Sequence, residues 1–236
     1  MTRQRKLLAL ALALSVLPGA ALAEPFVRMH TPDGDIYLEL FADKAPITVK
    51  NFLHYVDTRR FDGAEFFRAS TPKGATTKDY GILEGGIEHH PEKLFPPIAH
   101  ESTAKTGLSN TDGTISMARN APGTAQANFS IAVGDQTYLD ADPKDPAKHP
   151  GYAAFGRVVS GMDVVKEILA RPTDPHKGEG VMKGEILAHP VPILSVRRVP
   201  ESAVPKPPPR APAPLGPPQP PPTIIGSPAP APAQPQ

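Results

Sequence analysis

The stretch Gly113–Asp135, GTISMARNAPGTAQANFSIAVGD, contains two short alternating segments joined by a loop of small and polar residues. Thr114–Ala118 and Phe129–Val133 alternate polar and apolar side chains, which is typical of strands that are buried on one face. The loop between them is too polar for a core and too short for a domain. Such a loop on two strands often forms a groove for an extended ligand. A surface connection without a role explains this pattern equally well.

The chain around this stretch predicts many short strands and only two helices. Val27–His30 and Ile36–Phe41 flank an Asp-Gly turn and form a predicted hairpin, in which alternate apolar residues point inward. Further strands are expected over Phe61–Ala69 and Val191–Val199. The helices are expected from Ala45-Pro46 to about Asp57 and over Gly161–Arg171, where apolar residues follow helical spacing. This pattern favours a barrel or a sandwich. The inward-pointing hairpin residues are Ile36, Leu38 and Leu40.

Six short motifs occur along the chain in an order that resembles the cyclophilin family of peptidyl-prolyl isomerases. Each motif is weak alone, but most of the spacings between them also match, and the resemblance spans roughly residues 26–199. It implies a mainly β fold, a closed eight-stranded antiparallel barrel capped by two α-helices. The motifs are Phe66-Phe67-Arg68, Glu84-Gly85-Gly86, Ser116-Met117-Ala118-Arg119, Asn128-Phe129-Ser130-Ile131, Leu139-Asp140 and Phe155-Gly156-Arg157-Val158.

The resemblance implies that the protein accelerates rotation about X-Pro peptide bonds. The barrier to this rotation is about 20 kcal/mol, and lowering it requires no nucleophile, metal or cofactor. It requires contacts that favour the twisted amide, whose prolyl nitrogen carries a free lone pair. The family pattern places Arg68 as the donor to that nitrogen, a task for which a planar, permanently charged guanidinium is suited. A lone arginine would otherwise be interpreted as a surface ion-pair residue.

Other positions of the family's substrate groove carry over one at a time. Ile82 and Leu139 correspond to apolar pocket residues, although either alone would be interpreted as barrel core. Ala118 and Arg119 correspond to the strand edge that binds the peptide backbone. The remaining counterparts at the groove are Glu84, Asn128, Ser130, Tyr138 and Tyr152.

Three departures from the family pattern affect the predicted groove. Glu84 replaces a glutamine, so a carboxylate that only accepts hydrogen bonds lies near Arg68 and could lock it in a salt bridge. Ser130 replaces a phenylalanine of the pocket floor, and Phe129 should face the opposite side of its strand. Gly81 replaces another pocket phenylalanine, and a polar insert around Thr71–Lys78 lies between Arg68 and these pocket positions. These departures leave an alternative open, a proline-peptide binding module or chaperone with weak or no catalysis.

Residues 1–23 have the composition of a secretory signal peptide. A basic start precedes the apolar run Leu7–Leu17, and Ala21-Leu22-Ala23 provides a cleavage site before Glu24. The apolar run is too short to span a bilayer, and no later stretch is long enough, so no membrane span is expected. We expect export to a bacterial periplasm, with the isomerase-like domain over 24–199. The chain has no cysteine, which excludes disulfides, thiol catalysis and a cysteine-linked lipid anchor.

The segment 200–236 is dominated by proline and alanine and lacks apolar periodicity. We expect a disordered, extended tail that serves as a spacer. Two alternatives are that it binds a partner in the cell envelope or that its X-Pro bonds enter the protein's own groove.

The charge balance and the histidines argue against several other functions. Without residues 1–23, which contain three basic residues and no acidic one, 22 basic side chains are balanced by 24 acidic ones. This balance argues against nucleic-acid or acidic-membrane binding. His89-His90 with His100 lacks metal-site spacing, so neither a metal nor a cofactor is expected. The expected partners are proline-containing flexible polypeptides, bound by a monomer.

Overall fold

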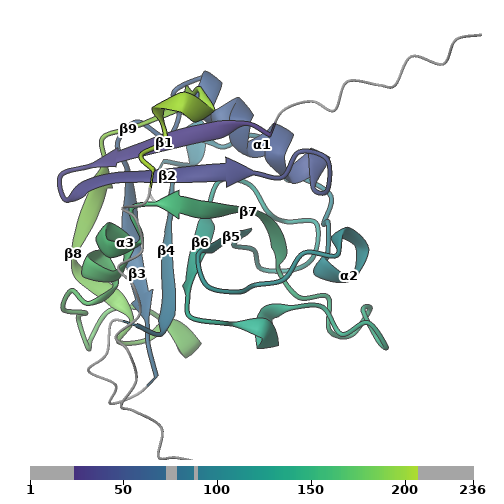
Figure 1. Cartoon of the computed structure of the whole chain (residues 1–236). Helices are drawn as coiled ribbons and strands as arrows, with labels where there is room; N and C mark the ends of the chain where they lie inside the picture. The colour runs from purple at the N-terminus through teal and green to yellow at the C-terminus, as the bar shows by residue number, and fades with distance from the viewer. Residues whose placement is uncertain (1–23, 73–78, 88–89, 207–236) are drawn as a thin grey trace, which may run out of the picture. The chain divides into compact units, whose positions relative to one another are not determined.

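The computed structural model describes residues 24–72, 79–87 and 90–206 (Figure 1). The predicted signal peptide, most of the polar insert, His89 and nearly all of the Pro-rich segment lie outside these residues. The strands within them belong to one antiparallel sheet. They are β1 (Phe26–Thr31), β2 (Gly34–Leu40), β3 (Ala64–Ser70), β4 (Gly81–Gly86), β5 (Thr114–Met117), β6 (Phe129–Val133), β7 (Ala153–Ser160), β8 (Ile186–Ile193) and β9 (Ser195–Val199).

The sheet is closed into a barrel by the last segment of the chain. The strand order is β8-β3-β4-β6-β5-β7-β2-β1-β9, so β8 and β9 form its two edges. These two strands are separated by Leu194 alone, whose N–H donates to the carbonyl of His30 at 2.8 Å. One continuous stretch therefore pairs with β3 at one edge and β1 at the other. The predicted eight-stranded barrel is confirmed, with its last strand divided in two and beginning at Ile186 rather than Val191.

The barrel encloses a core of aliphatic and aromatic side chains. The predicted hairpin is formed by β1 and β2, and its three inward-pointing residues are fully buried. The rings of Phe61 and Phe129 lie 5.9 Å apart, and that of Phe66 lies 6.0 Å from Phe129. Phe61 belongs to a turn rather than to the strand predicted for it, because β3 begins at Ala64.

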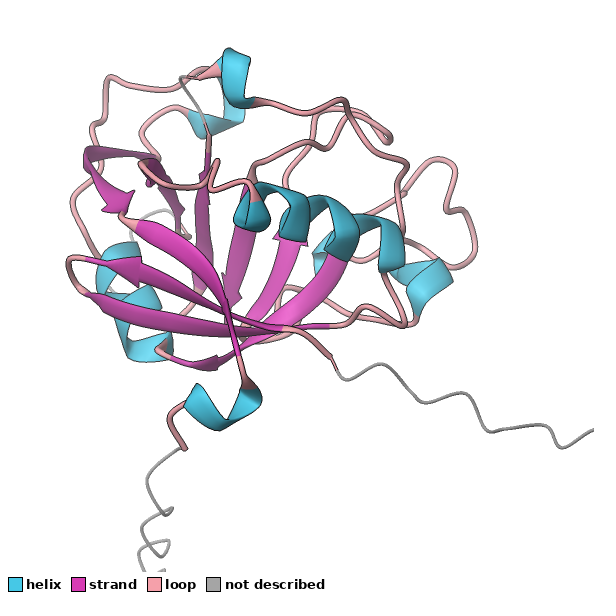
Figure 2. Cartoon of the chain, turned by 90° about the horizontal axis from the view of Figure 1, so that it is seen from above, coloured by secondary structure: helices cyan, strands magenta, loops and turns pink. Residues whose placement is uncertain are grey.

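Both predicted helices pack against the barrel. Helix α1 (Pro46–Asp57) lies against β7 and β9, and α3 (Met162–Leu169) lies against β2, β3, β4 and β6 (Figures 1 and 2). A four-residue helix, α2 (Thr103–Thr106), was not predicted. Single 3₁₀ turns occur at Pro91–Lys93, Thr137–Leu139, Gly180–Met182 and Glu201–Ala203.

The start of α1 is capped by a residue far away in the sequence. Ala45 precedes the helix and offers no side-chain cap. The carboxylate of Glu101 accepts hydrogen bonds from the backbone N–H of Ile47 (3.2 Å) and of Thr48 (2.8 Å), and from the Thr48 hydroxyl (2.7 Å). A negative charge at this end also favours the helix dipole. Glu101 therefore fixes the long loop before β5 to the helix.

The described part of the chain offers neither a membrane-spanning helix nor a cluster of metal-binding side chains. None of the described helices combines the length and apolar character needed to cross a membrane. Within the same residues, no group of three histidine, aspartate or glutamate side chains is placed to hold a metal ion.

Candidate functional site

A bulge in β3 turns Arg68 to the outside of the barrel. In the pairing with β4, Phe66 lies opposite Gly85 and Arg68 lies opposite Glu84, so Phe67 is an extra residue. Residues two apart normally share a face, and an extra residue between them reverses this rule. Phe66 is fully buried in the core, whereas Arg68 reaches the outer surface. Because of this bulge, Phe66 and Arg68 point to opposite faces of the sheet although they are two positions apart.

Arg68, Glu84 and Ser130 form a row across three neighbouring strands. Glu84 pairs with Arg68 on one side and with Ser130 on the other, so all three side chains lie on the same outer face. Figure 1 shows the strands that carry them, β3, β4 and β6, side by side. The pleat thus brings together three of the residues predicted for the groove.

Two carboxylates hold the Arg68 guanidinium. Its Nη1 donates to Oε2 of Glu84 at 2.7 Å, while Nε and Nη2 donate to Oε2 of Glu185 at 2.9 Å and 2.7 Å. Burial lowers the pKa of Arg68, but the hydrogen bonds to Glu84 and Glu185 outweigh this effect and raise it overall. The group is therefore a fixed cation. The salt bridge with Glu84 was predicted, whereas no motif marks Glu185.

A hollow of about 620 Å³ lies over this row. All ten residues predicted for the groove line it, although they come from six separate parts of the sequence. Their individual roles remain predictions. The ten are Arg68, Ile82, Glu84, Ala118, Arg119, Asn128, Ser130, Tyr138, Leu139 and Tyr152.

The loop between β5 and β6 is built into this groove. Asn51 of α1 donates to the carbonyl of Gln126 at 2.6 Å, and the Gln126 side chain donates to the carbonyl of Phe95 at 2.8 Å. Ala118 donates through its backbone N–H to Asn128 at 2.9 Å, which closes the base of the loop. Because the loop supplies much of the lining, it is more than a surface connection.

Glycine at position 86 allows the loop to approach the sheet. Gly86 has a φ of +143°, and a Cβ there would overlap the Asn128 side chain. Asn128 accepts a hydrogen bond from the backbone N–H of Ile87 at 3.0 Å through Oδ1. This contact fixes the predicted groove residue Asn128 beside the end of β4.

The rim of the groove is apolar and aromatic on one side. Tyr138 is 68% exposed and Val181 is 87% exposed, and both line the hollow with Met182. The turn that carries Tyr138 and Leu139 is anchored by Asp140, which accepts from the backbone N–H (2.8 Å) and the side-chain amide (2.6 Å) of Asn110. The Leu139-Asp140 motif thus joins a lining residue to its anchor.

A cation–π contact lies at another part of the rim. The guanidinium of Arg119 lies 4.8 Å from the ring centre of Tyr152, and it donates to the backbone carbonyl of Gly151. Both side chains were predicted at the groove. Arg119 is therefore held against the rim, which leaves Arg68 as the arginine in the central row.

The departure at Ser130 has the predicted geometric consequence. Phe129 is fully buried and contacts the rings of Phe52, Phe61 and Phe66 inside the barrel. It is absent from the lining of the hollow, which at this strand includes its neighbour Ser130. The hollow therefore has a serine rather than an aromatic side chain at this position.

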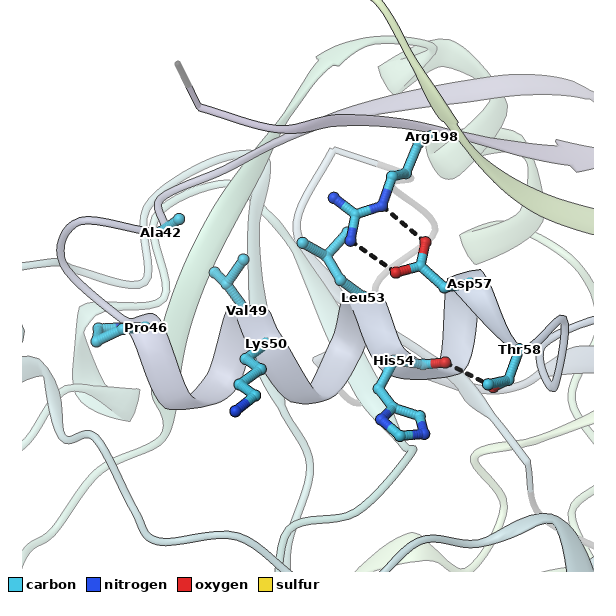
Figure 3. A pocket seen from close by; sticks show the side chains of 9 residues that line it. All are labelled: Ala42, Pro46, Val49, Lys50, Leu53, His54, Asp57, Thr58 and Arg198. Carbon is cyan, nitrogen blue, oxygen red and sulfur yellow. Dashed lines mark hydrogen bonds and ion pairs between the residues drawn. The ribbon is translucent and has the colours of Figure 1, made fainter. Parts of the chain in front are cut away.

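A second hollow of about 560 Å³ runs along α1 and contains none of the predicted groove residues. Figure 3 shows Arg198 facing Asp57 across it, while Lys50 and His54 project away from this ion pair. The Arg198 guanidinium makes two hydrogen bonds of 2.7 Å to the Asp57 carboxylate. This pair ties β9 to the end of α1, so we assign it to the structure of the barrel.

The barrel and the outward arginine in its groove define the class of protein. A model of the family "Cyclophilin type peptidyl-prolyl cis-trans isomerase/CLD" matches residues 26–197, and the chain belongs to this family. The chain is 35% identical over 193 residues to a peptidyl-prolyl cis-trans isomerase of Acinetobacter baylyi, covering 81% of this chain and 95% of that protein. It is 38% identical over 143 residues to peptidyl-prolyl cis-trans isomerase B of Escherichia coli, covering 60% and 82%.

Solved structures show the same fold. A cyclophilin type peptidyl-prolyl cis-trans isomerase of Cryptosporidium parvum superimposes with a TM-score of 0.57 at 20% identity, covering 75% of this chain and 98% of that one. A second crystal structure of the same protein, in the presence of the dipeptide Ala-Pro, superimposes with a TM-score of 0.56 at 21% identity, covering 73% and 97%.

Proposed function

We propose that this protein catalyses cis–trans rotation of X-Pro bonds in exported polypeptides and thereby assists their folding. One observation carries the proposal, the charged Arg68 guanidinium that is fixed on the outer face of the barrel within the groove. Family membership and the names of the bacterial relatives support the same activity.

The groove offers what this reaction requires. Rotation breaks amide resonance and leaves a lone pair on the prolyl nitrogen, which a fixed N–H donor stabilises more than it stabilises either planar isomer. Arg68 supplies such donors without reorganisation, because its position is already set. Ile82 and Leu139 provide an apolar lining for the proline ring. Rotation about the X-Pro bond in this groove therefore needs neither a metal nor a covalent intermediate.

A proline-peptide binding module or chaperone with little catalysis is the second candidate. Two observations favour it. The Glu84 carboxylate accepts a hydrogen bond from Arg68 at 2.7 Å, which reduces the positive potential offered to substrate, and position 130 of the lining is a serine rather than an aromatic residue. Both features weaken catalysis or affinity without removing the groove.

Exchange NMR on a short Ala-Pro peptide separates the two candidates. The isomerase proposal predicts that catalytic amounts of the protein accelerate cis–trans exchange and that Arg68→Ala abolishes the acceleration. Arg157→Ala is a matched control, because this exposed arginine pairs with Glu39 on β2 and does not line the groove. Peptide binding without accelerated exchange in the wild type would refute the isomerase proposal and favour the binding module.

The exported location is proposed from residues 1–23, with the Pro-rich segment as a spacer or as a ligand for an envelope partner. Support comes from the signal-like composition of residues 1–23, which end in the cleavage sequence Ala21-Leu22-Ala23 before Glu24. Mass spectrometry of the protein from periplasmic extract should find an N-terminus at Glu24. An intact N-terminus in the cytoplasmic fraction would contradict export.

A further inference from the structure

Glu185 lies outside every recognised motif, yet its backbone is fixed beside Arg68. It precedes β8, after the 3₁₀ turn at Gly180–Met182. Its N–H donates to the carbonyl of Met182 at 3.0 Å, and its own carbonyl accepts from the N–H of Ala69 at 2.9 Å. Because Ala69 adjoins Arg68 on β3, these bonds keep Glu185 next to the guanidinium.

Both carboxylate oxygens of Glu185 accept hydrogen bonds from side chains of β3. Oε2 accepts from Nε and Nη2 of Arg68, at 2.9 Å and 2.7 Å, and Oε1 accepts from the hydroxyl of Ser70 at 3.0 Å. Arg68 and Ser70 are neighbours on the outer face of β3. The carboxylate therefore bridges two consecutive outward side chains and cannot rotate without losing one of them.

We propose that Glu185 is a positioning residue, which sets the plane of the Arg68 guanidinium for its work on the X-Pro bond. This inference rests on the proposed function. Glu185 binds Nε–H, the donor nearest the side-chain stem, and Glu84 binds one N–H of Nη1 from the neighbouring strand. Within the described residues, three of the five guanidinium N–H groups are thus engaged, and one on each Nη remains for a substrate.

Glu185 acts on Arg68 in two opposing ways. Its hydrogen bonds hold the guanidinium in one orientation, which favours catalysis because the donor is already placed. Its negative charge reduces the positive potential at the same group, which disfavours catalysis. Glu185→Gln separates the effects. Its amide oxygen still accepts from Arg68, and its amide nitrogen can donate to the Ser70 hydroxyl, which in the wild type donates to the carboxylate. Glu185→Ala removes both the hydrogen bonds that orient the guanidinium and the negative charge.

The test compares Glu185→Ala, Glu185→Gln and the control Glu179→Ala in the purified protein. Glu179 is an exposed glutamate at the same turn, and its side chain does not line the groove. We expect Glu185→Ala to lower kcat/KM for the Ala-Pro peptide by about ten-fold or more, because a misplaced donor loses most of its effect. We expect Glu185→Gln to restore the rate to within about two-fold of wild type, and the control to match wild type.

A spectroscopic measurement tests positioning independently of turnover. The Nε–H signal of Arg68 should be protected from solvent exchange and rigid in the wild type and in Glu185→Gln. It should lose protection in Glu185→Ala. If Glu185→Ala does not fold, Ser70→Ala replaces it, since this change removes only the anchor of Oε1 and should cause a smaller loss of protection and rate.

The outcomes distinguish failure of this inference from failure of the proposed function. A wild type without accelerated exchange refutes the isomerase, and the Arg68 signal then decides alone whether Glu185 holds the guanidinium. A signal that stays protected in Glu185→Ala, or a rate that equals or exceeds that of the wild type, overturns the positioning role.

Discussion

Arg68 and Glu84 lie directly opposite each other on β3 and β4, and Nη1 of the arginine donates to Oε2 of the glutamate at 2.7 Å. They are sixteen positions apart in the sequence, with a polar insert between them. The cross-strand pairing makes the contact unavoidable, because opposite residues of an antiparallel pair share a face. Glu84, which belongs to one of the six motifs, therefore reduces the positive potential at the Arg68 guanidinium.

Glu84→Gln should raise activity. The amide oxygen keeps the hydrogen bond to Arg68, while the loss of one negative charge increases the positive potential at the prolyl nitrogen. The pair is partly exposed, so the expected gain in kcat/KM is modest, about two- to five-fold. Steady-state exchange rates on the Ala-Pro peptide measure it. An unchanged or lower rate would show that the Glu84 charge does not restrain Arg68.

Ser130→Phe should strengthen substrate binding. The side chain at 130 points into the groove, and an aromatic face there would contact the proline ring. We expect KM to fall by about five-fold, equivalent to about 1 kcal/mol of added apolar contact. Ser102→Phe, on a surface outside the groove lining, is the control. A KM that stays at the wild-type value would contradict the assignment of 130 to the proline pocket.

Glu101→Ala should destabilise the fold without altering the groove lining. It leaves the N–H groups of Ile47 and Thr48 at the start of α1 without their acceptor, and Glu101 is only 3% exposed. The expected loss in free energy of unfolding is about 2–3 kcal/mol, measured by urea denaturation. Glu92→Ala removes an exposed glutamate as the control. Equal midpoints for the two variants would mean that Glu101 does not cap the helix.

Acid should weaken the closure of the barrel. The Arg198 and Arg197 guanidinium groups hold the pKa values of Asp57 and Asp62 below the ordinary value of 3.8. A lowered folded-state pKa contributes stability that is fully present above the unfolded value and is lost as the pH falls through the folded one. Urea midpoints should therefore decrease below about pH 4.

The double variant Asp57→Asn, Asp62→Asn checks this cause. It should show a shallower decrease in midpoint over the same pH range, because these two groups no longer take up protons on unfolding. A pH profile parallel to that of the wild type would assign acid sensitivity to other carboxylates.

Much of the fold could be predicted from local pattern. The hairpin followed from an Asp-Gly turn between alternating strands, and α1 followed from Pro46 at its first turn with apolar residues at helical spacing. The ten groove residues required the order of six motifs, because no local pattern indicates that Ser130 and Tyr152 line the same hollow.

The rest depends on contacts between distant segments. The bulge at Phe67 cannot be predicted from the alternation of polar and apolar residues, and it decides which face of the sheet Arg68 occupies. Glu101 and Glu185 act through partners 53 and 117 positions away, so neither sequence neighbourhood indicates a role. The division of the last strand at Leu194 arises from closing the sheet, which local sequence does not encode.

The role of Arg68 is tested most sharply by the exchange rate of the Ala-Pro peptide with the wild type and with Arg68→Lys. Lysine keeps the positive charge but lacks the planar fork and the Nε–H that Glu185 binds. We expect clear acceleration by the wild type and almost none by Arg68→Lys. Equal acceleration by both proteins would contradict the claim that a fixed guanidinium, rather than a nearby positive charge, performs the reaction.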